Sequence, residues 1–261
     1  MSSGFSLPPA SGVGYQAVSF DLLGAAVGGS SDTVHAARLA AFARIRTEKS
    51  RYGIVNDYVA TRLGLAIGAP VVDGYLVKVG SDTWAFSTVA FGEKGQRLPP
   101  ADLEELATLR PWEATGIYVL DQWILNLDRH DENIGYLEKL GVAAFDHEWS
   151  LFGPGREDQT ASLRASRDKR VEKHPIAEWL ATDVHVSQWL RRVRSVQPEE
   201  LNRHVGGCVH VGLLSREEAG ALVDFLIYRQ ANIARYIDDS WGDFKNLTKI
   251  SLPDTEVSDN E

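Results

Sequence analysis

Apolar and polar residues alternate in the first third of this chain in the way typical of β-strands. Residues 15–48 read as β-structure broken by the glycine-rich stretch 24–29, with a strand expected over 39–47. Two more strands are expected over 71–79 and 83–91, on either side of a turn-forming Gly-Ser-Asp. The pattern therefore predicts a small region rich in β-strands.

Helical spacing of apolar residues interrupts these strands once and then dominates the rest of the chain. Over 53–65 apolar residues recur every three or four positions, and Gly68 is placed to end this helix. The same spacing predicts helices over 112–127, 175–195 and 216–238. The second part of the chain is therefore expected to be mainly helical.

These patterns divide the chain into four segments. A flexible arm is expected over 1–14, a β-rich part over 15–95, a mainly helical part over 96–245 and an acidic, flexible tail over 246–261. Within the helical part, residues 155–173 are expected to be mobile, as either an activation-type segment or a surface loop.

Charge and composition narrow the classes of function. The chain has 36 acidic and 27 basic residues and a net charge of −9, which disfavours nucleic acid and anionic membranes as partners. Its one cysteine, Cys208, excludes an internal disulfide framework and suits a reducing compartment. The sequence shows no signal-peptide pattern and no apolar stretch long enough to cross a bilayer, so we expect a cytoplasmic protein.

The strongest chemical signal lies in the loop that follows the helix over 112–127. Asp128 and Asn133 are five residues apart in this loop, and Asp146 comes directly after the apolar run 141–145. In a phosphoryl-transfer site one carboxylate takes the proton of the attacking hydroxyl, while an amide oxygen and a second carboxylate bind Mg²⁺. Each residue alone is also typical of a polar turn, but the three at this spacing favour a phosphoryl-transfer site.

The segment Asn126-Leu-Asp-Arg-His-Asp-Glu-Asn133, together with Phe145-Asp-His147, resembles the catalytic and metal-binding loops of HipA-like kinases. It is more distantly similar to those of phosphoinositide 3/4-kinases. The resemblance implies an α+β, bilobal protein-kinase-like fold with a small β-rich N-lobe that binds nucleotide and a mainly helical C-lobe. It also implies ATP and Mg²⁺ as cofactors.

The resemblance further implies roles for individual residues. Asp128 is the expected catalytic carboxylate, Asn133 an expected Mg²⁺ ligand and Asp146 the main Mg²⁺ ligand. Asn126 and His130 are grouped with the catalytic residue as its supports.

Three neighbouring residues are interpreted as further supports of this site. Arg129 is expected to anchor the loop to a carboxylate or a carbonyl group. His147 and Glu148 lie beside the metal ligand, where we expect them to orient it rather than to bind the metal.

The residues that would bind the nucleotide phosphates depart from the family pattern. HipA-like kinases use a strand lysine paired with a helix glutamate, whereas alignment places Arg44 and Asp57 at these positions. Arginine is longer than lysine and aspartate is shorter than glutamate, so the pair is expected to span a similar gap. Two alternatives are that Lys49 supplies the charge, or that the pair is lost and catalysis is impaired.

These features predict an ATP- and Mg²⁺-dependent kinase that transfers the γ-phosphoryl group to a hydroxyl, with Ser or Thr of a protein as the expected acceptor. A nucleotide-binding pseudokinase that regulates a partner protein is one alternative, motivated by the unusual Arg44 and Asp57. A metal-dependent phosphoesterase built from the same acidic and histidine residues is a second, weaker one.

Overall fold

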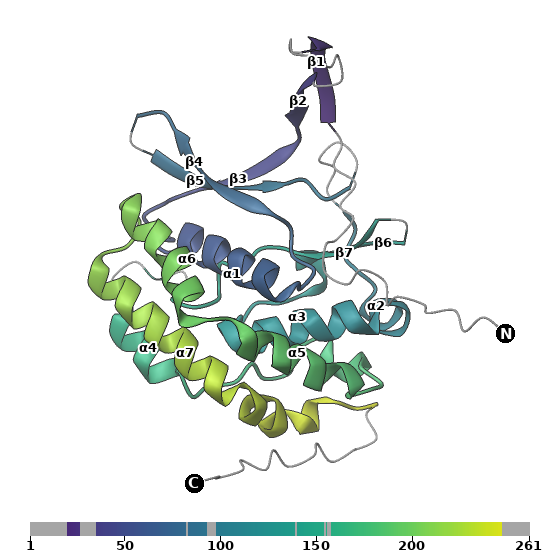
Figure 1. Ribbon diagram of the computed structural model, residues 1–261. Helices are drawn as coiled ribbons and strands as arrows, with labels where there is room; N and C mark the ends of the chain where they lie inside the picture. Colours follow the sequence, from purple (N-terminus) through teal and green to yellow (C-terminus); the bar gives the residue numbers. More distant parts are fainter. Residues whose placement is uncertain are drawn as a thin grey trace, which may run out of the picture.

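The computed structural model describes residues 20–26, 35–81, 83–92, 98–138, 140–153, 155 and 158–246 (Figure 1). The predicted arm over 1–14 lies outside these residues, and so does the end of the glycine-rich stretch, 27–29. Of the predicted tail over 246–261, only Asn246 is described. The fold is α+β, as the sequence predicted. One helix (Gly53–Ile67) interrupts the first five strands, and one strand pair (Ile134–Leu137 with Gly141–Ala144) interrupts the helices that follow.

The strands form three separate antiparallel sheets. Their bounds are β1 (Phe20–Ala26), β2 (His35–Leu39), β3 (Ala41–Ile45), β4 (Gly74–Val79), β5 (Thr83–Val89), β6 (Ile134–Leu137) and β7 (Gly141–Ala144). The largest sheet has the order β3-β5-β4, while β1 pairs with β2 and β6 pairs with β7. In Figure 1 the β1–β2 ribbon projects from the top of the molecule, beyond the larger sheet.

Seven α-helices and three short 3₁₀ turns make up most of the rest of the described chain. The helices are α1 (Gly53–Ile67), α2 (Leu103–Leu109), α3 (Pro111–Ile124), α4 (Thr160–Ser166), α5 (Val184–Ser195), α6 (Pro198–His210) and α7 (Arg216–Asp239). The turns are η1 (Asp131–Asn133), η2 (Ala177–Trp179) and η3 (Trp241–Asp243). Of the helices described, none is both long and apolar enough to cross a membrane.

Helix α1 connects the sheet to the helical part of the molecule. It lies beneath the β3-β5-β4 sheet in Figure 1 and contacts β3, β4, β5, α5 and α6. It ends at Gly68, whose φ of 72° is the left-handed conformation that favours glycine. Just beyond, Val72 donates a backbone hydrogen bond to Ala144, so the chain leaving α1 is tied to β7. Residues on α1 and on the β7 loop are therefore held close together.

Helices α3, α5 and α7 build the main core. Gly116 on α3 lies against the indole of Trp189 on α5, and Trp123 donates a hydrogen bond of 3.1 Å to the carbonyl of Leu226 on α7. Both indoles are fully buried. This packing fixes the C-terminal end of α3, from which the predicted catalytic loop departs.

Helix α7 begins with a capping box that reaches back to the start of α1. Ser215 and Glu218 cap the helix reciprocally, and the Glu218 carboxylate also accepts hydrogen bonds of 2.6 Å from Arg51 and from the Tyr52 hydroxyl. These contacts fix the position of the segment that enters α1.

Most of the strands and helices expected from the sequence are present. The structure differs from the prediction in two segments, 175–195 and 155–173. The helix predicted over 175–195 is regular only from Val184, because residues 175–183 contain the turn η2 instead. The segment 155–173, predicted to be mobile, contains α4, which packs against α7. Its apolar Leu163 is almost fully buried in the core, which explains why this short helix forms.

The packing of α3 on α5 can be tested by Gly116→Ala. A Cβ at this position would lie 2.6 Å from the Trp189 ring, so we expect the free energy of unfolding to fall by about 1–3 kcal/mol. Urea denaturation measures the change. Gly220→Ala is the matched control, because a Cβ there meets no atom within 4 Å on an exposed position of α7, and should stabilise by about 0.5–1 kcal/mol. Equal effects at both positions would contradict the close packing.

Candidate active site

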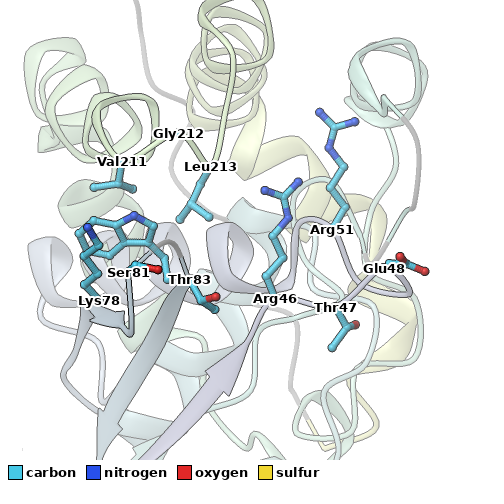
Figure 2. Close-up of a pocket in the computed structure, with 11 residues that line it drawn as sticks. Arg46, Thr47, Glu48, Arg51, Lys78, Ser81, Thr83, Val211, Gly212 and Leu213 are labelled. Atoms are coloured by element: carbon cyan, nitrogen blue, oxygen red, sulfur yellow. The ribbon is translucent and has the colours of Figure 1, made fainter.

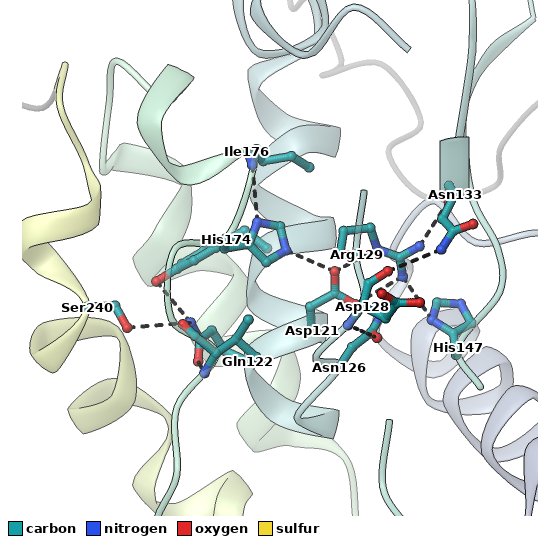
Figure 3. Close-up of polar contacts among 12 residues, drawn as sticks. Asp121, Gln122, Asn126, Asp128, Arg129, Asn133, His147, His174, Ile176 and Ser240 are labelled. Atoms are coloured by element: carbon teal, nitrogen blue, oxygen red, sulfur yellow. Dashed lines mark hydrogen bonds and ion pairs between the residues drawn. The ribbon is translucent and has the colours of Figure 1, made fainter. Parts of the chain in front are cut away.

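The side chain of Arg129 connects the segments that carry the predicted site (Figure 3). Its Nε and Nη2 donate to the two oxygens of Asp121 at 2.8 and 3.0 Å. Its Nη1 donates to the carbonyls of Asn133 and Phe145 at 2.9 and 2.7 Å, and Nη2 also donates to Nδ1 of His147 at 2.9 Å. All five guanidinium N–H groups therefore have acceptors. The expected anchoring role of Arg129 is confirmed, with carboxylate and carbonyl acceptors together.

Asp121, on the last turn of α3, is the buried anion that balances this cation. It has no exposed side-chain surface, and it accepts further hydrogen bonds from Asn126 Nδ2 at 2.9 Å and His174 Nε2 at 3.0 Å. His174 Nδ1 accepts from the Ile176 amide, so the proton shared with Asp121 lies on Nε2. Although burial raises the pKa of Asp121, Arg129 and His174 hold it well below its usual range.

The predicted catalytic loop is stabilised by hydrogen bonds between its own residues and to Asp121. The Asn126 side chain is fully buried, with Nδ2 on Asp121 and Oδ1 accepting from the Asp128 amide at 3.3 Å. Because this side chain is fully buried, Asn126 supports the loop rather than contacting a substrate. His130 is half exposed and lies 3.9 Å from Asp131. Asp128 itself is exposed, and its carboxylate accepts no hydrogen bond from any described residue.

Asn133 is oriented so that its amide oxygen is free. Its Nδ2 donates to the Asp128 carbonyl at 3.2 Å, and its own carbonyl accepts from Arg129 and from the Phe145 amide. No described residue donates to Oδ1. The Asn133 side chain is thus fixed by its nitrogen, and its oxygen is available to a hard cation.

Asp146 follows β7 with a φ of 56°, a left-handed conformation unusual for a residue with a Cβ. Oδ1 accepts from Arg44 Nη2 at 2.7 Å, whereas no described residue donates to the second oxygen. Strained backbone of this kind concentrates at functional sites, because surrounding contacts must hold it. Here Arg129 and the Phe145 carbonyl hold the preceding residue.

Arg44, at the end of β3, collects three carboxylates from distant parts of the chain. Nε pairs with Asp57 on α1 at 2.6 Å, Nη2 pairs with Asp146 at 2.7 Å, and Nη1 pairs with Glu148. The predicted pair of Arg44 and Asp57 is therefore present, so the pair is not lost, while the impaired catalysis that the alternative also proposed stays a prediction. The role of this pair in nucleotide binding stays a prediction.

Asp57 is almost fully buried, and both of its oxygens are used. Oδ2 accepts from Arg44, and Oδ1 accepts from the His147 amide at 2.6 Å. Burial raises the pKa of Asp57 to about 6, with a smaller contribution from the nearby Asp146 carboxylate, against the opposing effects of Arg44 and the amide. The Arg44 guanidinium is thus needed to keep this carboxylate charged near neutral pH.

Lys49 does not take the place proposed for it as an alternative. It lies exposed in the turn closed by the bridge between Thr47 and Ser50, and it is not among the residues that line the cleft. The turn directs its side chain to solvent, so Arg44 is the cation that the structure brings to Asp57 and Asp146.

A cleft of about 550 Å³ opens beside these charged groups. Its charged and polar lining includes Arg44, Asp57, Glu132, Asp146 and His147. Its other walls are mainly apolar and come from β3, β5, the segments before β4 and after β5, and the residue after β7: Phe42, Ala43, Val72, Phe86, Phe91, Leu98 and Phe145. The cleft therefore combines a charged end with an apolar compartment large enough for a flat ring system.

The sequence did not identify these apolar walls. Glu148 was interpreted as a support of Asp146, and its amide does donate to Asp146 Oδ1 at 3.5 Å. The sequence did not reveal that its carboxylate is the third one on Arg44. Asn56 was missed: it donates to the carbonyls of Glu148 and Gly153 at 2.7 and 2.9 Å and so fixes the loop after Asp146. The signal in the sequence was an asparagine next to Asp57 among apolar residues of this helix, which indicates a polar side chain with a specific partner.

The described residues contain no group of three or more His, Cys, Asp or Glu side chains arranged to hold a metal. His147, a ligand in the phosphoesterase alternative, has its Nδ1 occupied by Arg129 and its Nε2 buried. The geometry thus gives no support to that alternative.

Structure comparison finds the Helicobacter pylori proinflammatory kinase CtkA, at a TM-score of 0.53 and 14% identity, over 77% of this chain and 91% of that one. Shewanella oneidensis HipA, solved with HipB and operator DNA, matches at a TM-score of 0.43 and 13% identity, over 88% of this chain and 66% of that one. A scan against protein-family models finds no match, and a search of curated proteins finds none. The match to CtkA shows the fold alone, and on this basis the chain has a kinase-like fold.

The buried His147 should make stability depend on pH. Burial first, and then Arg129, lower its pKa from 6.5 to about 3, so its contribution to stability is complete above pH 6.5 and is lost as the pH falls. Between pH 7.5 and 5.0 we expect this histidine alone to cost roughly 2 kcal/mol of unfolding free energy.

Urea denaturation of wild type and His147→Asn at both pH values isolates this contribution, because asparagine can still accept from Arg129. The loss on acidification should be smaller in the variant by that amount. His130→Asn, at a half-exposed position, serves as the control. Parallel pH dependence in wild type and His147→Asn would refute the assignment.

Proposed function

We propose that this chain is an ATP- and Mg²⁺-dependent phosphotransferase whose acceptor is a hydroxyl group, with serine or threonine of a protein as the substrate class. The observation that carries the proposal is that Asp146 lines the charged end of an apolar cleft in a kinase-like fold, and that Arg129 ties the loop of Asp128 and Asn133 to the chain just before Asp146. The free oxygens of Asn133 and Asp146 and the free carboxylate of Asp128 support it.

The residues fit Mg²⁺ and a nucleotide. Asn133 Oδ1 and the free oxygen of Asp146 are hard oxygen ligands on two loops that Arg129 holds together, and the apolar walls suit a base. When bound, Mg²⁺ would offset the charge of the phosphates, and ATP would supply the γ-phosphoryl group.

Within this site Asp128 would accept the proton of the acceptor hydroxyl. Its carboxylate is solvent accessible, while its backbone is fixed on both sides by Asn126 and Asn133, so it can orient a hydroxyl without losing its place in the loop.

Arg44 would bind phosphate oxygens while it positions the carboxylates. Its three ion pairs use Nε and one N–H of each Nη, which leaves two N–H groups for an anion. Because arginine presents its donors in a fixed planar fork, one side chain can bind phosphate oxygens and position carboxylates at the same time. A lysine ammonium is less suited to these two roles.

The nucleotide-binding pseudokinase remains a second candidate because Arg44 is bonded to Asp146, the proposed metal ligand. If this pair persists when nucleotide binds, ATP would bind without turnover. Measuring ATP affinity and ATP turnover on the same preparation separates the two candidates.

Asp128→Asn and Asp146→Asn test the proposed chemistry. Each should lower Mg²⁺-dependent ATP turnover by about 10²–10⁴-fold, because each removes a charge that acts on the reacting groups. Phosphate release and phosphoprotein formation, followed by mass spectrometry, give the measurement. Asp131→Asn, an exposed position in the same loop, should retain activity. Normal turnover in either of the first two variants would refute the assigned roles.

Arg44→Ala tests the phosphate-binding role separately. We expect about tenfold weaker ATP binding by isothermal titration calorimetry, equivalent to about 1.4 kcal/mol, because a charge-assisted contact to the phosphates is lost. Lys49→Ala is the matched control and should bind ATP as wild type does, since Lys49 lies outside the cleft. Unchanged affinity in Arg44→Ala, or a loss confined to Lys49→Ala, would show that the phosphate-binding cation was misassigned.

A further inference from the structure

A second cavity, of about 620 Å³, lies outside the proposed active site (Figure 2). It is bounded by the turn between β3 and α1, the turn between β4 and β5, and the turn between α6 and α7. Its lining residues are Arg46, Thr47, Glu48, Arg51, Lys78, Ser81, Thr83, Trp84, Val211, Gly212 and Leu213. It shares no lining residue with the cleft that contains Arg44.

Two cations in this pocket have no counterion among the described residues. Arg46 and Lys78 are exposed, and neither side chain makes a hydrogen bond or an ion pair with any part of the chain that the structure describes. In a protein with a net charge of −9, unpaired cations facing one pocket create a local field of the opposite sign. Figure 2 shows the Glu48 carboxylate pointing away from both of them.

A third cation, Arg51, is held rigidly at the edge of the pocket. One Nη is paired with Glu218 at 2.6 Å, and the guanidinium lies over the Tyr52 ring at 5.0 Å. Its Nε is buried and lacks a hydrogen-bond partner among the described residues. The side chain is thus fixed by contacts on one face and retains donors that are not satisfied.

The pocket is also partly apolar and is larger than a single anion needs. Trp84, Val211 and Leu213 contribute apolar surface beside the cations. A cavity of about 620 Å³ would hold many waters of about 30 Å³ each, and an inorganic anion would leave the apolar lining in contact with water. The lining therefore suits a ligand that carries carboxylates next to an apolar side chain.

We propose that this pocket binds an acidic peptide segment of a partner protein. Carboxylates of the segment pair with Arg46 and Lys78, and an adjacent apolar side chain packs against Val211 and Leu213. Arg46 lies just beyond β3, which carries Arg44, so a protein bound here is held beside the proposed active site. The inference does not depend on the proposed kinase activity, because peptide binding is measured without nucleotide.

Fluorescence polarisation with the full chain tests the proposal. The probe is a labelled peptide with Glu and Asp on both sides of a leucine, and the control peptide has Gln and Asn in place of the acids. The acidic probe should bind, and its affinity should fall as the salt concentration rises. Binding of both peptides with equal affinity, or of neither, would overturn the proposal.

The double variant Arg46→Ala/Lys78→Ala should bind the acidic probe about tenfold more weakly, since each exposed ion pair lost weakens binding about threefold. The matched control Arg194→Ala/Arg203→Ala removes two exposed cations from α5 and α6, outside the pocket, and should bind as wild type. Thermal unfolding establishes that both variants are folded.

An equal loss of probe affinity in the two double variants would mean that only the net charge of the protein matters. Displacement of the probe by an equal concentration of inorganic phosphate would mean that the pocket is a simple anion site. Either result would refute the proposal.

Discussion

A buried guanidinium is tolerated in a protein only if its charge is balanced and its donors are satisfied, and Arg129 meets both conditions. Its acceptors come from the end of α3, the start of β6, the end of β7 and the loop beyond. Removing one partner would leave a buried charge or buried carbonyls unsatisfied, at a cost of several kcal/mol. The positions of Asn133 and Asp146 both depend on this one side chain, because its Nη1 binds the Asn133 and Phe145 carbonyls.

A second guanidinium, that of Arg44, joins the β3-β5-β4 sheet to the loop after β7. It differs from Arg129 in being partly exposed, with about 30% of its side chain accessible, and in facing more anions than it can neutralise. Three carboxylates around one cation leave excess negative charge at the polar end of the cleft. A divalent cation would reduce that excess, whereas at Arg129 the charges are already balanced. Arg129 thus has a structural role, whereas Arg44 is placed to respond to a bound ligand.

The cleft and the second pocket have different chemistry, although the cleft takes residues from β3 and α1 and the second pocket from the segment between them. The cleft pairs anions with an apolar compartment, and the second pocket pairs free cations with a smaller apolar surface. Glu218 and Tyr52 fix the entry to α1, and the stacked rings of Tyr52 and Phe152, with centroids 4.3 Å apart, attach that entry to the loop beyond Asp146. The segment that carries Asp57 is therefore fixed at its start by contacts between distant parts of the chain.

The sequence by itself determined the α+β class, the strands β3 to β5, the helices α1, α3 and α7 and the loop that contains Asp128 and Asn133, because these depend on local periodicity and on motif spacing. It also aligned Arg44 with Asp57. Only the tertiary structure revealed that Glu148 joins this pair, that α4 and α6 form, and which residues line either pocket. Short or glycine-containing helices such as α4 and α6 are stabilised by burial against other elements, and pocket walls are drawn from segments more than a hundred residues apart. No pattern within one segment carries that information.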